Sequence, residues 1–234
     1  MIDQARLATA AAAHGIALSD AQLAQLDRYA EILVATNAQF NLTAITDPEG
    51  IENKHFLDSL LLAAQPELTG SLVDVGSGAG FPGVVAGLYR PALRLTLLEP
   101  TGKRLEFLRS LCGELGVRAD FLKERAEEAA RKQWREGFDL ATARAVARLD
   151  KLAEYCLPLV RVGGLFIAMK AESAAEELAE AQGAIARLGG RVRDVRTAAL
   201  PGGDARSLIF VEKISHTPPQ YPRNGGKIAK SPLR

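Results

Sequence analysis

Apolar side chains in the first 65 residues recur at the spacing of amphipathic helices. Ser19 and Asp20 suit a helix start, because their side chains can accept hydrogen bonds from the free N–H groups of a first turn. Asp47 followed by Pro48 is a second start of this kind. We therefore predict an all-helical extension over residues 1–65, with helices at residues 4–13, 19–34, from 47, and at 54–64.

From residue 71 onward, short apolar strands alternate with helices, which is typical of a mostly parallel, doubly wound sheet. The last two strands have no helix between them, and the sequence Leu-Pro-Gly-Gly-Asp at 200–204 predicts an antiparallel hairpin. The fold class is therefore α/β, with a seven-stranded sheet in a domain over residues 66–215 and a tail over 216–234. The strands are expected at residues 72–75, 93–98, 117–122, 138–143, 165–169, 191–199 and 207–213, and the helices at 81–89, 101–115, 149–160 and 174–188.

Composition is that of an ordinary globular protein: of 234 residues, 47% are hydrophobic and 24% are charged. No apolar run approaches the roughly 20 residues of a membrane-spanning helix, and the N-terminus lacks a signal-peptide pattern. Cys112 and Cys156 form neither a disulfide framework nor a metal pattern, so we expect a reducing, cytoplasmic compartment. With only three histidines, no metal site is expected.

The net charge of +1 conceals an uneven distribution. Residues 1–70 carry three Lys or Arg against nine Asp or Glu, whereas residues 213–234 carry five cations and no acid. A basic tail rich in Pro and Gly favours a polyanionic partner such as RNA. The alternative is a solvated tail that only keeps the protein in solution.

Three glycines alternate directly after the first strand of the sheet, in the segment DVGSGAGF at residues 74–81. Turns at this position bind nucleotide-like ligands, and glycines let the backbone approach them closely. The dinucleotide fingerprint requires its third glycine where Phe81 stands, and the acid Asp74 is unlike a pyrophosphate site. A ligand with a cationic amino acid end, such as S-adenosylmethionine, fits better, and the alternative is a turn without a ligand. The cofactor candidates of this segment are Asp74, Gly76, Gly78, Gly80 and Phe81.

Glu99 ends the second strand, 23 residues after Gly76. A carboxylate there can accept hydrogen bonds from both hydroxyls of a ribose. Glu99 therefore supports an adenosine cofactor, although nicotinamide enzymes place an acid similarly. The alternative is a surface glutamate at the end of a strand.

Short segments in order along nearly the whole chain resemble those of one family. Beside the glycine loop they are NLTAI at 41–45, KHFLDSL at 54–60, GKR at 102–104, RAE at 125–127, RAV at 144–146 and TPPQYPR at 217–223. The chain resembles the class I S-adenosylmethionine-dependent methyltransferases, and more narrowly the bacterial 16S rRNA guanine-N7 methyltransferases of the glucose-inhibited division protein B family. Glu99 is a mild departure, because relatives often have aspartate there.

The resemblance implies a Rossmann-like sheet of the class I methyltransferase type, S-adenosylmethionine as cofactor, and 16S rRNA or the small ribosomal subunit as partner. It implies that Arg144 lies at the mouth of the site, facing the methyl donor and the incoming base; a salt bridge to an acid such as Asp139 is the alternative. We assign no other catalytic role and expect a monomer. The remaining residues implied to contact the cofactor are Gly76, Phe81, Glu99, Pro100, Thr101, Ala126 and Glu127.

Two types of base methylation are disfavoured, because the sequence lacks the groups that they require. The Asn/Asp-Pro-Pro-aromatic motif of adenine amino methylation is absent after strand four, where the chain reads Ala-Arg-Ala-Val at 143–146. Methylation of a pyrimidine carbon needs a cysteine nucleophile, but Cys112 and Cys156 fall within predicted helices. The N7 atom of guanine is nucleophilic without activation and needs mainly positioning. The sequence is therefore compatible with an N7 target, in the loop near the decoding site that the resemblance implies.

RNA contacts are expected from cations at the open end of the sheet and in the tail. The alternative is that these residues are ordinary surface charges. His55 is expected to be a packed histidine. A small-molecule or protein methyltransferase, one acting on another RNA position, a nicotinamide dehydrogenase and a non-catalytic RNA-binding module are the competing functions. The RNA-binding candidates are Lys170, Arg206, Arg223, Lys227 and Lys230.

Overall fold

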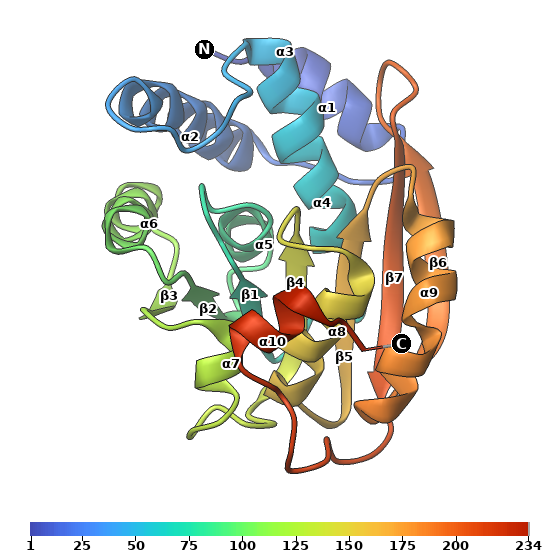
Figure 1. The fold of residues 1–234 in the computed structure, drawn as a ribbon. Coiled ribbons are helices and arrows are strands. Elements are labelled where there is room, and N and C mark those ends of the chain that lie inside the picture. The colour runs from blue at the N-terminus through green and yellow to red at the C-terminus, as the bar shows by residue number, and fades with distance from the viewer. Residues whose placement is uncertain (234) are drawn as a thin grey trace.

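A computed structural model describes residues 1–233 and has a seven-stranded sheet in the order β3-β2-β1-β4-β5-β7-β6 (Figure 1). Strands β1 to β5 run parallel, and β7 pairs antiparallel with both β5 and β6. The predicted seven strands and the terminal hairpin are thereby confirmed. The strands are β1 Ser71–Val75, β2 Arg94–Leu98, β3 Ala119–Leu122, β4 Phe138–Arg144, β5 Val160–Lys170, β6 Gly190–Ala199 and β7 Ala205–Lys213.

Helices cover both faces of the sheet. One hydrophobic cluster joins Leu72 and Leu95 of the sheet to α1, α2, α4, α5 and α6, and the other joins Val73 and Phe166 to α7, α8 and α9. Successive strand residues belong to opposite clusters, because side chains alternate across a sheet. The helices are α1 Gln4–Ala12, α2 Asp20–Asn37, α3 Pro48–Gly50, α4 Asp58–Ala63, α5 Gly83–Tyr89, α6 Gly102–Leu115, α7 Ala126–Ala129, α8 Leu149–Cys156, α9 Ala174–Arg187 and α10 Gly225–Lys230.

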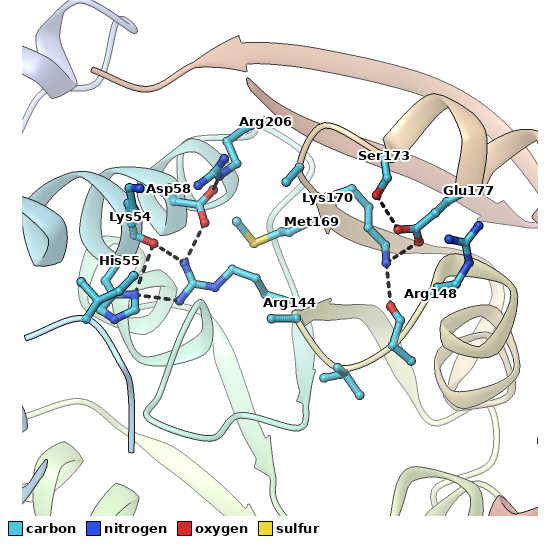
Figure 2. Close-up of a pocket in the computed structure, with 15 residues that line it drawn as sticks. Lys54, His55, Asp58, Arg144, Arg148, Met169, Lys170, Ser173, Glu177 and Arg206 are labelled. Atoms are coloured by element: carbon cyan, nitrogen blue, oxygen red, sulfur yellow. Dashed lines mark hydrogen bonds and ion pairs between the residues drawn. The ribbon is translucent and has the colours of Figure 1, made fainter. Parts of the chain in front are cut away.

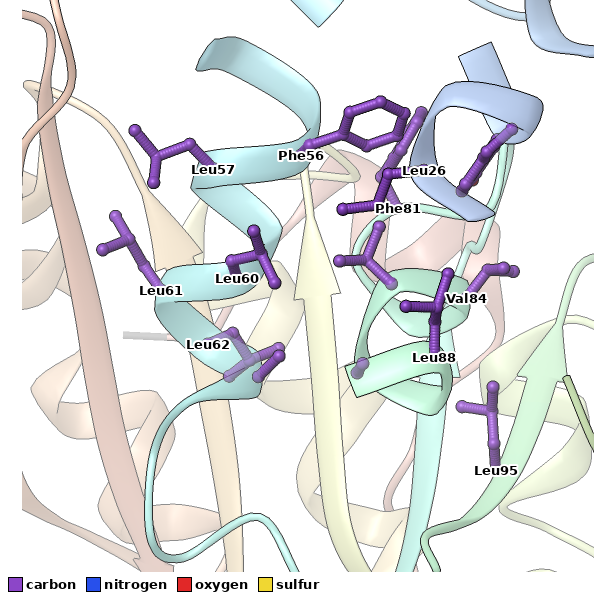
Figure 3. Packing of buried hydrophobic residues seen from close by; sticks show 14 of the residues in the cluster. Leu26, Phe56, Leu57, Leu60, Leu61, Leu62, Phe81, Val84, Leu88 and Leu95 are labelled. Carbon is purple, nitrogen blue, oxygen red and sulfur yellow. The ribbon is translucent and has the colours of Figure 1, made fainter. Parts of the chain in front are cut away.

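The apolar face of the helical extension packs against helix α5, which covers the sheet. Figure 3 shows Phe56 and Leu60 directed toward Val84 and Leu88 of α5, with Leu26 of α2 beside them. The predicted start of α2 is confirmed, since the Ser19 side chain accepts a hydrogen bond from Gln22 N–H in a capping box. This packing holds the segment after residue 50 at the carboxyl ends of the strands.

The structure differs from the predicted elements at four places. Pro158 cannot continue a helix, so α8 ends at Cys156 and a 3₁₀ turn, η2 Leu157–Leu159, leads into a longer β5. Residues 51–57 form a π-helix, η1 Ile51–Leu57, which overlaps the start of the expected helix at 54–64. The short helices α7 and α10 were not predicted, because they lie outside any long apolar repeat.

Candidate active site

The carboxyl ends of β1, β2 and β4 surround a cavity of about 550 Å³, which we call the glycine-loop cavity. Parallel strands bring their carboxyl ends to one edge, so residues distant in sequence meet there. Its lining residues are Leu42, Thr43, His55, Gly76, Ser77, Gly78, Ala79, Phe81, Glu99, Pro100, Thr101, Arg104, Arg125, Arg144, Ala145 and Val146.

Two glycines of the loop are required for different reasons. Gly76 has a φ of +73°, and a Cβ there would lie 2.7 Å from Val146 Cγ2. At Gly78 a Cβ would meet no protein atom closer than 3.7 Å, so the space beside this backbone is open to the cavity. An open face of glycine backbone permits close approach of a ligand.

Glu99 holds the loop and borders the cavity. Its side chain is almost fully buried; Oε2 accepts from Gly78 N–H at 3.1 Å and Oε1 from Thr101 N–H at 2.9 Å. A carboxylate offers about four lone-pair sites, so each oxygen keeps capacity for one more donor. The acceptor capacity left on Glu99 suits vicinal hydroxyls, as on a ribose.

Asp74 lies beneath the loop and outside the lining of the cavity. Its Oδ2 accepts from Gly83 N–H at 3.0 Å, and its Oδ1 has no partner among residues 1–233. Burial raises the pKa of this carboxyl from 3.8 to about 7, against the lowering effect of the bond from Gly83. Asp74 is therefore in a position to support the start of α5, and any contact with a ligand would be indirect.

The raised pKa of Asp74 predicts a specific pH dependence of stability. Between pH 4 and 7 the folded protein holds a proton that the unfolded chain releases, so this group makes the free energy of unfolding fall as pH rises. Asp74→Asn should remove that contribution, which urea unfolding at pH 5 and pH 8 would measure. The exposed Asp120→Asn is the control, and an identical pH response in all three proteins would contradict the assignment.

Besides Asp74, three more of the expected cofactor residues do not line the glycine-loop cavity. Ala126 and Glu127 begin α7 and are buried, with Glu127 against the backbone of Gly225, because the tail packs onto this helix. The preceding residue, Arg125, lines the cavity instead. Gly80 faces away, since a Cβ there would collide with the Tyr29 hydroxyl.

A second cavity of about 530 Å³ adjoins the first (Figure 2). The two share His55, Arg144, Ala145 and Val146 as a common wall. Ala145 has a φ of +58°, an uncommon conformation for a residue with a Cβ, and it turns the chain out of β4 into this wall. The other lining residues are Ile45, Lys54, Asp58, Ala147, Arg148, Met169, Lys170, Ala171, Ser173, Glu177 and Arg206.

Arg144 is held at this wall by the π-helix. Its Nη1 donates to Asp58 Oδ2 at 2.7 Å and to the Lys54 carbonyl at 2.9 Å, and its guanidinium lies 5.2 Å from the centroid of the Phe81 ring. Asp58 N–H bonds to Asn53 O, five residues back, so the Lys54 carbonyl that accepts from Arg144 lies in the π-helical turn. The partner of Arg144 is therefore Asp58, whereas Asp139 pairs with Arg94 and Arg161.

His55 lies against the same wall as a neutral ring. It stacks on Phe81 with centroids 4.4 Å apart, and Phe81 stacks in turn on Tyr29 at 4.9 Å. Burial and the nearby charge of Arg144 lower the pKa of His55 to about 4. At neutral pH the His55 ring is therefore uncharged and cannot act as a cationic acid.

Two of the RNA candidates, Lys170 and Arg206, line the second cavity together with Arg144. Arg206 lies 3.2 Å from Asp58 Oδ1, so Asp58 is shared by two arginines. Lys170 is nearly buried, with Nζ 2.7 Å from Glu177 and 2.6 Å from the Ala147 carbonyl. Lys170 therefore fixes the loop after β4 before any RNA is bound.

The tail is packed onto the body of the protein rather than extended into solvent. Arg223 is in a buried ion pair with the fully buried Glu154 of α8, 2.6 Å away. Arg131 and Arg135 donate to tail carbonyls at Pro222 and Tyr221. Among the described residues, the second cavity has no lining residue after Arg206. Arg223 forms this structural ion pair, and its role in RNA binding stays a prediction. Lys227 and Lys230 are exposed on α10, where their role in RNA binding stays a prediction.

Within residues 1–233, no helix is long and apolar enough to cross a bilayer, and no group of three His, Cys, Asp or Glu is arranged to hold a metal ion. Cys112 and Cys156 are free and buried.

Known proteins resemble this chain along almost its whole length. Residues 22–208 match the family model of GidB, rRNA small subunit methyltransferase G. The chain is 49% identical over 225 residues to the ribosomal RNA small subunit methyltransferase G of Geobacillus thermodenitrificans, covering 94% of each chain. It is 46% identical to that of Exiguobacterium sibiricum, covering 99% of this chain and 100% of the relative. Among solved structures, an S-adenosylmethionine-dependent O-methyltransferase from Thermotoga maritima shares the fold, with a TM-score of 0.52, 14% identity, and coverage of 79% of this chain and 72% of that one.

Proposed function

The chain belongs to the rRNA small subunit methyltransferase G family, and from that membership we propose that it transfers a methyl group from S-adenosylmethionine to N7 of one guanine in 16S rRNA, near the decoding site. The observation that carries the proposal is the pair of cavities with Arg144 and Ala145 in their common wall. A methyl donor in one and a base in the other would meet at that wall. An rRNA substrate and two free cysteines both fit a cytoplasmic enzyme.

The residues of the glycine-loop cavity fit S-adenosylmethionine. The open backbone at Gly78 admits a close ligand, and Glu99 keeps acceptor capacity for ribose hydroxyls. Pro100, Thr101 and Arg125 border the same end of the cavity. The bound cofactor supplies an electrophilic methyl group on a sulfonium.

The second cavity suits a nucleotide. Five cationic and two anionic side chains line it, which favours a phosphate-bearing substrate. Ile45, Val146 and Met169 supply an apolar surface for a base. A base in this cavity must be withdrawn from its stack, as is required for enzymes that modify bases.

The protein's own contribution to the reaction is to orient the guanine base toward the methyl group and to exclude water. Guanine N7 offers a lone pair in the plane of the ring, so no side chain has to remove a proton. The neutral His55 agrees with this, because at neutral pH it cannot act as a cationic acid. Arg144 would keep the wall rigid so that the lone pair and the methyl group remain in line.

Loss of both cysteines should leave methyl transfer nearly unchanged. Burial raises the pKa of Cys112 to about 12 and that of Cys156 further, so neither supplies a thiolate. In the Cys112→Ala, Cys156→Ala double variant, turnover at 25 °C should stay within about twofold while thermal stability falls, because small cavities form in two buried positions. Loss of turnover in a folded double variant would instead indicate covalent catalysis.

The position of the methyl group is the direct test of the proposal. RNA methylated at N7 carries a cationic ring, and borohydride followed by aniline should cleave the strand at one guanine of 16S rRNA. Small ribosomal subunits and free 16S rRNA, each with a labelled methyl donor, are the substrates to compare. Incorporated label without strand cleavage would show that another atom is methylated.

A further inference from the structure

Thr43 borders the glycine-loop cavity from the segment that joins α2 to α3. Asn37 Oδ1 accepts from the N–H groups of Leu42 at 2.7 Å and Thr43 at 2.9 Å, which fixes the backbone there. The side chain of Thr43 lines the cavity and is half-buried. Its position is therefore set by the protein rather than by a ligand.

The tautomer of His55 determines what the Thr43 hydroxyl can do. Arg144 Nη2 lies 3.4 Å from His55 Nδ1, and a guanidinium can only donate. The Lys54 carbonyl lies 3.2 Å from the same nitrogen and accepts from Arg144 Nη1 at 2.9 Å; its second lone pair is open to an Nδ1–H, so the charge of Arg144 decides between the tautomers. A positive charge beside Nδ1 favours a lone pair on that atom, which leaves the proton on Nε2.

With the proton of His55 on Nε2, both lone pairs of the Thr43 hydroxyl accept hydrogen bonds from protein groups. Its Oγ1 accepts from His55 Nε2–H at 2.9 Å and from Ile45 N–H at 3.1 Å. A hydroxyl has two lone pairs and one proton. The O–H of Thr43 then has no acceptor among the described residues, beside a cavity built for a ligand.

The order of strands in the sheet indicates which end of a ligand in the glycine-loop cavity lies beside the Thr43 hydroxyl. Glu99 and Arg125 follow β2 and β3, whereas Phe81 and Arg144 follow β1 and β4, on the opposite side of the cavity. Thr43 belongs to the second group, because it is bonded to His55, which stacks on Phe81. If the ribose lies at Glu99, the amino acid end lies beside Thr43.

We propose that Thr43 is a positioning residue whose O–H donates to the carboxylate of the methionine moiety of S-adenosylmethionine, with its proton directed by His55 and Arg144. The proposal rests on the proposed function, because it takes that cofactor as the ligand. The nearby charge of Arg144 favours the anionic carboxylate over the ammonium at this position.

Ligands with and without the carboxylate test the proposal by equilibrium binding. Thr43→Val keeps the shape of the side chain and removes the hydroxyl, so affinity for S-adenosylmethionine and S-adenosylhomocysteine should fall about 10- to 100-fold, as for a lost hydrogen bond to a charged group. Affinity for decarboxylated S-adenosylmethionine and 5′-methylthioadenosine should change less than threefold. Thr43→Ser should restore wild-type binding, and Thr69→Val, in an exposed turn at the opposite end of the sheet, is the matched control.

Two results would overturn the assignment of Thr43. An equal loss for all four ligands would mean that the substitution only disturbs the loop, and no loss for any would mean that no such bond forms. Nitrogen-15 NMR of the His55 ring measures its tautomer independently. The Nε2–H tautomer is expected, and the Nδ1–H tautomer would contradict the proposed role of Thr43. If the wild-type protein bound none of the four ligands, the proposed function itself would fail.

Discussion

Replacing Arg144 by alanine should lower methyl transfer to small-subunit rRNA by about 100-fold or more, because misplacement of reacting groups by about 1 Å can cost that much. Arg144 joins Asp58 and the Lys54 carbonyl of the helical extension to the Phe81 ring of the glycine loop. Without it the common wall of the two cavities loses its fixed geometry. Single-turnover methylation with saturating cofactor measures the chemical step directly.

Arg144→Lys should recover only part of the activity, because an ammonium cannot donate in the planar fork that reaches Asp58 and His55 together. The control is Arg94→Ala, which removes a largely exposed arginine, paired with Asp139, from β2. The Arg94 variant should turn over normally. An Arg144→Ala enzyme within a few-fold of wild type would show that the wall does not depend on this side chain.

Arg223→Ala should reduce the free energy of unfolding by about 3–5 kcal/mol, the usual cost of leaving a buried charge without its partner. Glu154 is fully buried and accepts from the backbone N–H, Nε and Nη2 of Arg223, so removal of the guanidinium leaves only the backbone donor. For a chain of this length the melting temperature should fall by about 6–20 °C. Circular dichroism during a thermal ramp would measure it.

Lys227→Ala and Lys230→Ala are matched controls from the same tail, because both lysines are exposed on α10. Their melting temperatures should stay close to wild type. If Arg223→Ala melted like these controls while binding RNA less tightly, the tail would be an RNA-binding arm after all.

The architecture could be predicted because the spacing of apolar residues along the chain distinguishes strands from helices. What periodicity does not encode is a change of hydrogen-bonding register inside a helix. The apolar positions Phe56, Leu57 and Leu60 fit an ordinary helix, so the π-helix at Ile51–Leu57 had no signal in the pattern. Helix α10 was missed because six residues with one buried side chain, Ile228, carry no repeat.

Part of the site could also be predicted from the sequence and part could not. Glu99 and the glycine loop could be predicted as cavity residues, because each directly follows a strand. Asp58 could not be identified as the partner of Arg144, because the two are 86 residues apart and meet only through packing of the extension on α5. Net charge likewise does not reveal that Arg223 of the basic tail pairs with Glu154 of α8.

The contact between Arg223 and Glu154 also bears on synthesis of the protein. Glu154 of α8 precedes Arg223 by some 70 residues, so Glu154 lacks its partner until Arg223 has been synthesised. A polypeptide that terminates before Arg223 retains both cavities, the glycine loop and all seven strands, yet contains an uncompensated charge in its interior. Such a product would open readily and be degraded by proteases. Arg223 therefore couples the stability of α8 to a residue that is synthesised long after that helix.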